Sequence, residues 1–560
     1  DYTNIEFLSI TTPGSIRGLI TPNQGSEIKG SQSESFFRDS NFIVNAFLRY
    51  QNDITDKLNL SASVYGEYNY SNTQQAGFTA FGLNPALPGS SAGFTSGNTQ
   101  EGDDTNGDGI LDAETELALN YVPGVFSTES ELALASLFAT LDLDYDGKYG
   151  LAATVRRDKT SRFPKNSTGT FWSVAGRWNI DNEDFMSDVE FINALKLRAS
   201  YGVVGNQGVG GRYQGLQTVA ANPTSYQLGT GYGINGLIDE DIKWETTNQL
   251  NVGLSFGLWN NRLSGEFDYY DFLTDELFSN NAPLSVAQTG YNTVITNIGS
   301  MRNTGVDLQI AYDVLRKSQT NPWSITVRAN GNYNKNRVEE LPVGFTGNTL
   351  RVTEGRQAFT WHDVRWAGVD PSNGQPLYYD VNGNITNEYN PNDAVYLDKN
   401  FDPTYTGGFG TDISYKGFTL NALFSFAADR YRRNGSLAII EDASLAGFAN
   451  QSVTMLNAWT TPGQVTDIPR LSFQGRAEIG DRYIEDASYL RLRNISLSYT
   501  VDPKILERTN IISGMRIFVQ GTNVATWTKW RGFDPEGNQS GGFFDYPVPR
   551  TFTLGFDLNF

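Results

Sequence analysis

Strict alternation of apolar and polar residues is the feature that most limits what this chain can fold into. In one stretch, Leu250, Val252, Leu254, Phe256 and Leu258 alternate with Asn, Gly and Ser residues. The same period of two recurs over 58–70, 306–312, 323–333 and 551–560. Such a strand keeps one face in an apolar medium and the other in water. Two architectures satisfy this pattern, a soluble sandwich and a membrane barrel with lipid outside and water inside.

Strand length, aromatic placement and loop length favour the membrane barrel. The alternating run at 58–70 exceeds ten residues, whereas strands of soluble proteins typically have about five or six. Aromatic pairs at strand ends, as at 68–70 and 269–270, suit the girdles at a membrane interface. A tight turn at 258–263 contrasts with long segments that lack a strand pattern, at 73–127, 203–245, 342–403 and 436–486. The sequence therefore predicts an all-β, transmembrane antiparallel β-barrel with roughly 15 strands in this chain and long extracellular loops.

Composition removes several classes of function. The chain has 560 residues, a net charge of −20, no cysteine and one histidine. Nucleic-acid binding needs clustered Lys and Arg, so we predict no nucleic-acid partner. Thiolate metal sites and sites with two histidines are excluded. A mean hydropathy of −0.39 is compatible with a membrane barrel because only alternate residues face lipid.

Several stretches resemble the SusC/RagA family of TonB-dependent transporters from Bacteroidota. They are NIGSMRNTGVD at 297–307, YLRLRNISLSY at 489–499, GTNVATWT at 521–528 followed by GFDPE at 532–536, and YPVPRTFTLG at 546–555. Shorter matches lie at 367–371 and 405–409. Together these stretches cover much of the region 150–560.

This resemblance implies a barrel of about 22 strands, plugged by an N-terminal domain and embedded in the outer membrane among lipid and lipopolysaccharide. It also implies TonB-driven import of oligosaccharides or peptides, a SusD-like surface lipoprotein as a lid, and a dimer of transporter–lid pairs. Residues 1–560 are predicted to be the barrel portion. The plug, the first strands and the segment that contacts TonB are expected outside this chain.

One acidic segment matches the core of a calcium loop. Its predicted oxygen ligands for Ca²⁺ are Asp104, Asn106, Asp108, the carbonyl of Ile110, Asp112 and Glu116. Position twelve is Thr115 rather than Glu, so Glu114 or Glu116 would supply the last carboxylate. The alternative is an acidic Asn/Gly turn that holds no ion. The similar segment 380–384 has fewer carboxylates and is predicted to be a plain turn.

Aromatic residues in the long loops are the candidate ligand contacts. Trp361, Trp366, Tyr378 and Tyr379 either stack on sugar rings or peptide side chains, or pack the loops together. The segment 89–93 fits the G-x-S-x-G pattern of hydrolases, but it lies in a Gly/Ser loop and only His362 could act as base. We therefore predict no enzyme. The alternatives to import are a passive porin and a structural or secretion-complex barrel.

Overall fold

The fold is described from a computed structural model. It describes residues 2–11, 30–83, 124–208, 211–213, 216–222, 231–234, 236–341, 350–445, 447, 449–471, 480–506, 511–537 and 546–560. Within these ranges no helix combines the length and the apolar character needed to span a membrane.

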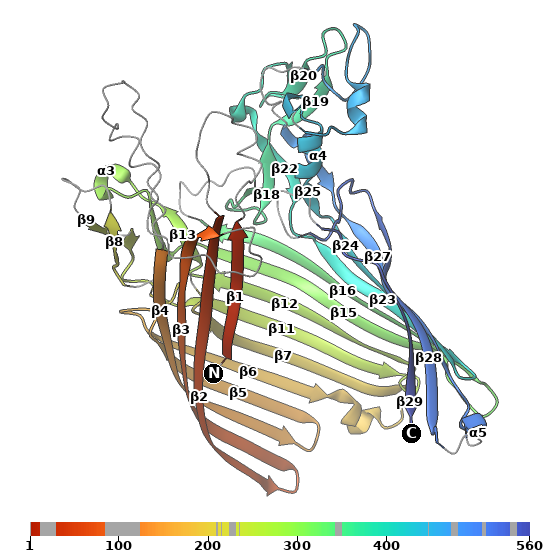
Figure 1. Ribbon diagram of the computed structural model, residues 1–560. Coiled ribbons are helices and arrows are strands. Elements are labelled where there is room, and N and C mark those ends of the chain that lie inside the picture. Colours follow the sequence, from red (N-terminus) through yellow and green to blue (C-terminus); the bar gives the residue numbers. More distant parts are fainter. Residues whose placement is uncertain are drawn as a thin grey trace, which may run out of the picture.

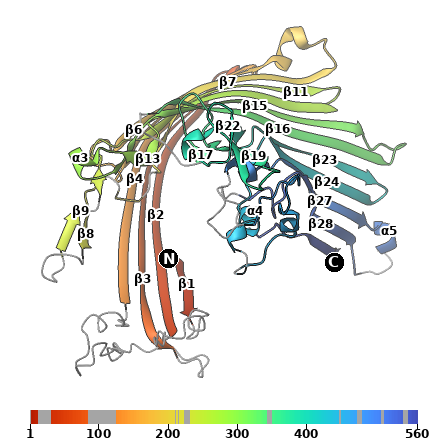
Figure 2. The same ribbon diagram turned by 90° about the horizontal axis from the view of Figure 1, so that it is seen from above.

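Sixteen strands form one sheet in which neighbours in sequence are neighbours in space. They are β1 (Tyr2–Thr11), β2 (Gly30–Thr55), β3 (Leu58–Leu83), β4 (Gly124–Tyr145), β5 (Tyr149–Thr160), β6 (Thr168–Asn179), β7 (Ile192–Asn206), β11 (Glu245–Leu258), β12 (Leu263–Asp275), β15 (Ser300–Leu315), β16 (Trp323–Glu340), β23 (Tyr405–Tyr415), β24 (Phe418–Ala428), β27 (Tyr489–Thr500), β28 (Gly514–Thr528) and β29 (Thr551–Asn559). The sheet curls into an arch whose two edges are β1 and β29 (Figures 1 and 2). The predicted antiparallel barrel fold is confirmed, with a strand number close to the predicted one.

The remaining elements lie in the connections between these strands. They are η1 (Ile180–Asn182), η2 (Asp184–Met186), β8 (Val219–Asn222), β9 (Gly231–Ile234), β10 (Leu237–Ile238), β13 (Phe278–Pro283), α3 (Val286–Thr289), β14 (Thr293–Asn297), β17 (Leu350–Arg351), β18 (Thr360–Asp363), β19 (Arg365–Val369), β20 (Pro376–Tyr379), β21 (Ile385–Thr386), η4 (Pro391–Asp393), β22 (Val395–Asn400), β25 (Tyr431–Arg433), α4 (Gly435–Ile440), η5 (Ala443–Leu445), η6 (Val453–Asn457), η7 (Gly480–Tyr483), β26 (Ile484–Asp486) and α5 (Pro503–Leu506).

Short turns and long loops occupy opposite ends of the sheet. The predicted turn between β11 and β12 is made by Trp259, Asn260 and Asn261, whose φ angles are 55°, 59° and 55°. Long connections at the other end carry β8–β10, β17–β22 and β25 (Figure 1). The loop predicted at 73–127 is shorter than expected, because β3 continues to Leu83 and β4 begins at Gly124.

The register separates an apolar convex face from a polar concave face. On one rung Val252 is paired with Tyr269, and Tyr269 with Val306. On the next rung Gly253 is paired with Asp268, and Asp268 with Asp307. Exposed apolar side chains cover the convex face, among them Leu137, Val155, Phe267, Phe409 and Leu554. Such a surface is costly in water and is expected where a barrel meets lipid.

Candidate functional site

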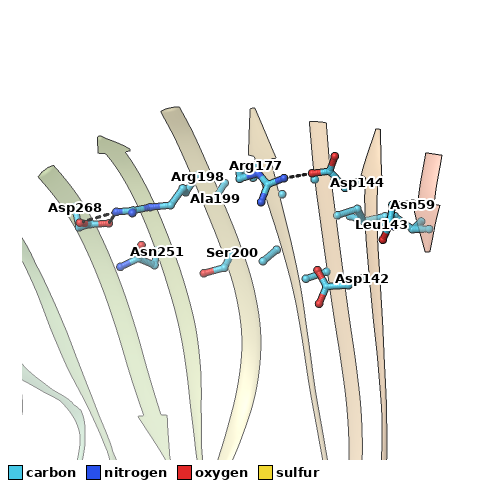
Figure 3. Close-up of a pocket in the computed structure, with 15 residues that line it drawn as sticks. Asn59, Asp142, Leu143, Asp144, Arg177, Arg198, Ala199, Ser200, Asn251 and Asp268 are labelled. Carbon is cyan, nitrogen blue, oxygen red and sulfur yellow. Dashed lines mark hydrogen bonds and ion pairs between the residues drawn. The ribbon is translucent and has the colours of Figure 1, made fainter. Parts of the chain in front are cut away.

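A belt of charged side chains crosses the concave face near the turn ends of the strands. Arg177 of β6 forms an ion pair with Asp144 of β4. Arg198 of β7 reaches across β11 to Asp268 of β12, with Nη2 3.1 Å from Oδ1 (Figure 3). Further along the sheet, Arg328 of β16 forms an ion pair with Asp412 of β23. We call Asp144, Arg177, Arg198, Asp268, Arg328 and Asp412 the inner belt.

Small residues on the intervening strand make room for the long side chains of the inner belt. A Cβ atom added to Gly253 would lie 2.9 Å from Nη2 and 3.1 Å from Nε of Arg198. The guanidinium therefore lies flat over β11 and reaches Asp268 two strands away, because β11 presents no side chain at that position. A glycine at this point in a strand indicates a close approach of this kind.

Four residues of the inner belt, Asp144, Arg177, Arg198 and Asp268, border an open hollow of about 440 Å³. The polar residues lining it include Asn59, Asp142, Asp144, Arg177, Arg198, Ser200, Asn251 and Asp268 (Figure 3). Half-exposed ion pairs of this kind add little to stability. These ion pairs instead present hydrogen-bond donors and acceptors of both charge signs to the hollow.

The long loops after β16 and β24 pack together into one body. We call the described residues of 350–404 and 429–488 the loop lobe; it lies over the ends of β16, β23, β24 and β27 (Figures 1 and 2). The backbone N–H of Trp366 donates to Asp481 Oδ1 at 2.8 Å, and Lys399 Nζ lies 3.2 Å from Asp481 Oδ2. Arg433 also forms an ion pair with Asp363. The two loops are therefore joined by several charged contacts.

Two of the four predicted ligand aromatics form the core of the loop lobe. Trp361 is 1% exposed and its Nε1 donates to the carbonyl of Tyr431 at 2.9 Å. Tyr378 is 2% exposed and meets the ring of Trp366 edge-on at 5.6 Å. Trp366 and Tyr379 keep part of their surface in solvent. For these two residues, contact with a ligand stays a prediction.

His362 lies in β18, at the edge of the lobe core. Its ring meets that of Tyr396 edge-on at a centroid distance of 4.7 Å. Burial lowers the pKa of His362 below its ordinary value of 6.5, and the nearby Arg351 lowers this pKa further. The imidazole is therefore neutral at neutral pH and packs as an aromatic ring.

Buried arginines connect the loop lobe to the wall of the sheet. Arg491 of β27 lies 2.8 Å from Asp534 and 2.5 Å from Glu536, both in the connection between β28 and β29. Arg493 also forms an ion pair with Glu536. From the lobe side, Arg432 Nη1 donates to the carbonyl of Asp534 at 2.9 Å. We call Arg491, Arg493, Asp534 and Glu536 the rim clamp.

The rim clamp joins two of the sequence stretches that carried the family resemblance. Arg491 and Arg493 belong to YLRLRNISLSY, and Asp534 and Glu536 belong to GFDPE. Sequence reasoning recognised both stretches but did not predict that they meet. One sequence signal could have indicated this contact. Arg491 and Arg493 are two positions apart on one strand, and arginines that become buried require acidic partners.

The calcium and hydrolase motifs at 104–116 and 89–93 lie outside the described residues. The predicted turn at 380–384 is confirmed. The Asp380 carboxylate accepts from the backbone N–H of Asn384 at 2.7 Å and from its side-chain amide at 2.9 Å. In the described part of the chain, no group of three or more His, Cys, Asp and Glu residues is arranged to hold a metal ion.

Comparisons with known proteins place this fold and its motifs in one family. The family model described as "TonB dependent receptor-like, beta-barrel" matches residues 2–524. TonB-dependent receptor P3 of Formosa agariphila is 30% identical over 492 residues, which cover 79% of this chain and 47% of that protein. TonB-dependent receptor SusC of Bacteroides thetaiotaomicron is 29% identical over 453 residues, covering 76% of this chain and 44% of SusC.

Solved structures give the same assignment. The RagAB peptide transporter matches with a TM-score of 0.82 and 28% sequence identity, over 96% of this chain and 57% of that chain. The chain spans about half the length of the curated relatives it matches. The predicted resemblance to SusC/RagA-type transporters is confirmed, and the chain belongs to the TonB-dependent receptor β-barrel family of the outer membrane.

Proposed function

We propose that this chain forms the wall of a TonB-energised importer that moves a polar nutrient across the outer membrane. The observation that carries the proposal is the inner belt. Ion pairs and amides line the concave face of a sheet whose convex face is apolar. A wall of this kind holds a water-filled path inside lipid.

The solute is proposed to be an oligosaccharide or a peptide. The inner belt offers guanidinium donors and carboxylate acceptors side by side, so it suits neutral or zwitterionic molecules that form many hydrogen bonds. A path selective for one charge sign would be lined by a ring of one sign. The similarity to a structure named as a peptide transporter supports the peptide half of this proposal.

The partners are proposed from the similarity to SusC/RagA-type transporters. A SusD-like surface lipoprotein would cover the loop side of the barrel, and TonB would act through a segment outside residues 1–560. Two such transporter–lid pairs would form a dimer in a membrane of lipid and lipopolysaccharide. The loop lobe supports this arrangement because it forms a folded platform at the loop ends of the strands.

Extraction of the complex from its native outer membrane in mild detergent tests this proposal. Mass spectrometry of the purified complex should identify a co-purifying surface lipoprotein, and reconstituted channels should stay closed in the absence of TonB. A channel that conducts without TonB, purified with no lipoprotein, would contradict the proposal and favour the passive pore or scaffold.

A further inference from the structure

A short charged run at the loop end of β5 is divided between the two faces of the sheet. Arg156 and Asp158 face the concave side, where Nε of Arg156 lies 2.7 Å from Oδ1 of Asp158. Arg157 and Lys159 occupy the alternate positions and therefore face the other side. The register agrees, because Arg157 is paired with Leu137 of the apolar convex face. Two cations of this run are thus directed outward.

These two cations lie just beyond the aromatic level of the convex face. Val155, two residues before Arg157, is paired with Trp172 of β6. The ring of Trp172 meets that of Tyr201 of β7 edge-on at 5.7 Å, and the two side chains are 42% and 44% exposed. Aromatic residues on the outside of a barrel mark the boundary between lipid and water. Arg157 and Lys159 are therefore expected at the level of the lipid headgroups on the loop side.

The positions directly beside the two cations carry no acid. Their partners on β4 are apolar, and on β6 Arg157 is paired with Thr170 and Lys159 with Thr168. Among the residues that the structure describes, no carboxylate forms an ion pair with either cation. All four polar side chains are exposed. We call Arg157, Lys159, Thr168 and Thr170 the outer basic patch.

Two other outward-facing cations at the loop end have acidic partners. Arg302 of β15 lies 2.6 Å from Asp271, and Arg337 of β16 lies 3.8 Å from Glu339. The whole chain has a net charge of −20, so acids are plentiful. The outer basic patch nevertheless keeps a positive charge that an external anion can balance.

A phosphate group attached to a lipid suits this patch by charge and by shape. Side chains two residues apart on a strand begin about 7 Å apart, so the long side chains of Arg157 and Lys159 can converge on one phosphate. Arginine supplies a fork of donors and lysine a compact charge, and the threonine hydroxyls add two further donors. Leu137 and Val155 lie beside the patch and are 62% and 51% exposed, so they offer an apolar surface to acyl chains. A soluble phosphate compound would not use that surface.

We propose that the outer basic patch binds a phosphate group of lipopolysaccharide in the outer leaflet. Arg157 and Lys159 would hold the phosphate, and the two threonine hydroxyls would donate to it or to the sugar that carries it. The acyl chains would lie along the convex face of β4 and β5. The inference goes beyond the proposed import function and depends only on the location of the barrel in the outer membrane.

The test measures the binding of monophosphoryl lipid A to the delipidated complex by native mass spectrometry in mild detergent. Arg157→Gln/Lys159→Gln removes both charges, and Arg157→Lys/Lys159→Arg keeps them. The control, Lys317→Gln/Lys416→Gln, removes two exposed cations from the turns after β15 and β23, at the opposite end of the sheet. Lipid A without phosphate, phosphatidylglycerol and inorganic phosphate are the comparison probes.

We expect the unaltered protein to bind monophosphoryl lipid A at least about tenfold more tightly than lipid A without phosphate. Arg157→Gln/Lys159→Gln should weaken binding of the phosphorylated form at least about tenfold and leave binding of the other form unchanged. The charge-conserving variant and the turn-end control should bind as the unaltered protein does. Phosphatidylglycerol should bind more weakly, and inorganic phosphate should not displace the lipid. A heat-sensitive band shift in gels verifies that each variant is folded.

Several results would overturn the inference. They are equal binding of lipid A with and without phosphate, equal weakening by the two glutamine variants, phosphatidylglycerol binding as tight as that of monophosphoryl lipid A, or displacement of the lipid by inorganic phosphate. The surface lipoprotein and the TonB dependence of the channel are read separately. Any of these results with both of those intact would refute the lipid site and leave the proposed import function standing.

Discussion

Burial divides the ion pairs of this chain into two kinds. Arg491 in the rim clamp has a side chain that is 3% exposed, whereas Arg198 in the inner belt is 36% exposed. Removing the partners of a buried guanidinium or of buried carboxylates strongly destabilises the folded protein. A pair open to water contributes little. The rim clamp is therefore expected to determine stability, and the inner belt to determine what the wall contacts.

The first prediction concerns the rim clamp. Arg491→Met should lower the free energy of unfolding by roughly 3–5 kcal/mol, because Asp534 and Glu536 keep their charges with fewer partners. Urea unfolding of the detergent-solubilised protein, followed by tryptophan fluorescence, measures this change. Arg356→Met is the control, since its partner Asp398 is 86% exposed; it should change the same quantity by less than about 1 kcal/mol. Equal effects of the two variants would contradict the assignment.

The second prediction concerns pH and His362. Its lowered pKa means that, below pH 6.5, the unfolded chain binds a proton more readily than the folded lobe does. This contribution to stability is complete above pH 6.5 and is lost as the pH falls further. Limited proteolysis of the loop lobe should therefore accelerate as the pH falls from about 6.5 to 5.5.

His362→Gln provides the control for this pH dependence. Glutamine does not titrate, so the variant should lose most of the change in proteolysis rate over that interval. If the variant keeps the full pH dependence, another group is responsible. Asp402 is not a substitute explanation, because burial raises its pKa and its protonation at low pH favours the folded form.

At the scale of elements, family motifs correspond to junctions between strands and loops. Asn297, at the end of β14, donates from Nδ2 to the carbonyls of Lys243 at 3.0 Å and Glu276 at 2.7 Å. Gly299 follows with a φ of 76°, just before β15 begins. The stretch NIGSM at 297–301 therefore fixes where two loops leave the wall. This junction requires both the amide side chain of Asn297 and the left-handed backbone of Gly299.

The third prediction tests this junction. Gly299→Ala should destabilise the protein by about 1–2 kcal/mol, because a left-handed backbone disfavours a Cβ atom. The added atom would also lie 2.5 Å from the carbonyl oxygen of Glu340. Gly331→Ala is the control within β16, where the nearest atom would be 3.9 Å away. Thermal unfolding in detergent should separate the two variants, and a Gly299→Ala protein as stable as the control would refute this reading.

The strands could be predicted from sequence because alternation is a local property. The tight turn at Trp259–Asn261 was also predicted correctly, because a turn of a few residues is likewise a local feature of the sequence. The end of β3 was not predicted, because its residues from Thr73 onward no longer alternate between apolar and polar. At 26 residues β3 is much longer than the roughly 9–11 residues that cross a bilayer.

The loop lobe and the rim clamp could not be predicted. Arg433 and Asp363 are 70 positions apart, and Arg491 and Asp534 are 43 apart, so no local pattern links them. Trp361 illustrates the same limit among the aromatics. A loop tryptophan that binds a ligand and one that forms a core have the same sequence context, and only the packing of the second loop places Trp361 in the core.

At the scale of the whole molecule, the two faces of the wall have different surroundings. The convex face meets lipid, and under the proposed function the concave face lines a path that opens when TonB acts. Leu308 and Gln309 are neighbours in β15 and lie on opposite faces; Gln309 borders a hollow next to Asp307 and Asn330. The chain contains no cysteine, so single cysteines introduced at these positions report on each face separately.

The most direct test of the central claim is the labelling of Leu308→Cys and Gln309→Cys in intact cells by a membrane-impermeant maleimide. The account predicts that Leu308→Cys stays protected under all conditions, and that Gln309→Cys reacts much faster in energised cells than in cells without TonB. Equal labelling of the two positions would contradict the assignment of the faces. Labelling of Gln309→Cys that is fast and independent of TonB would contradict gated import and indicate a passive pore.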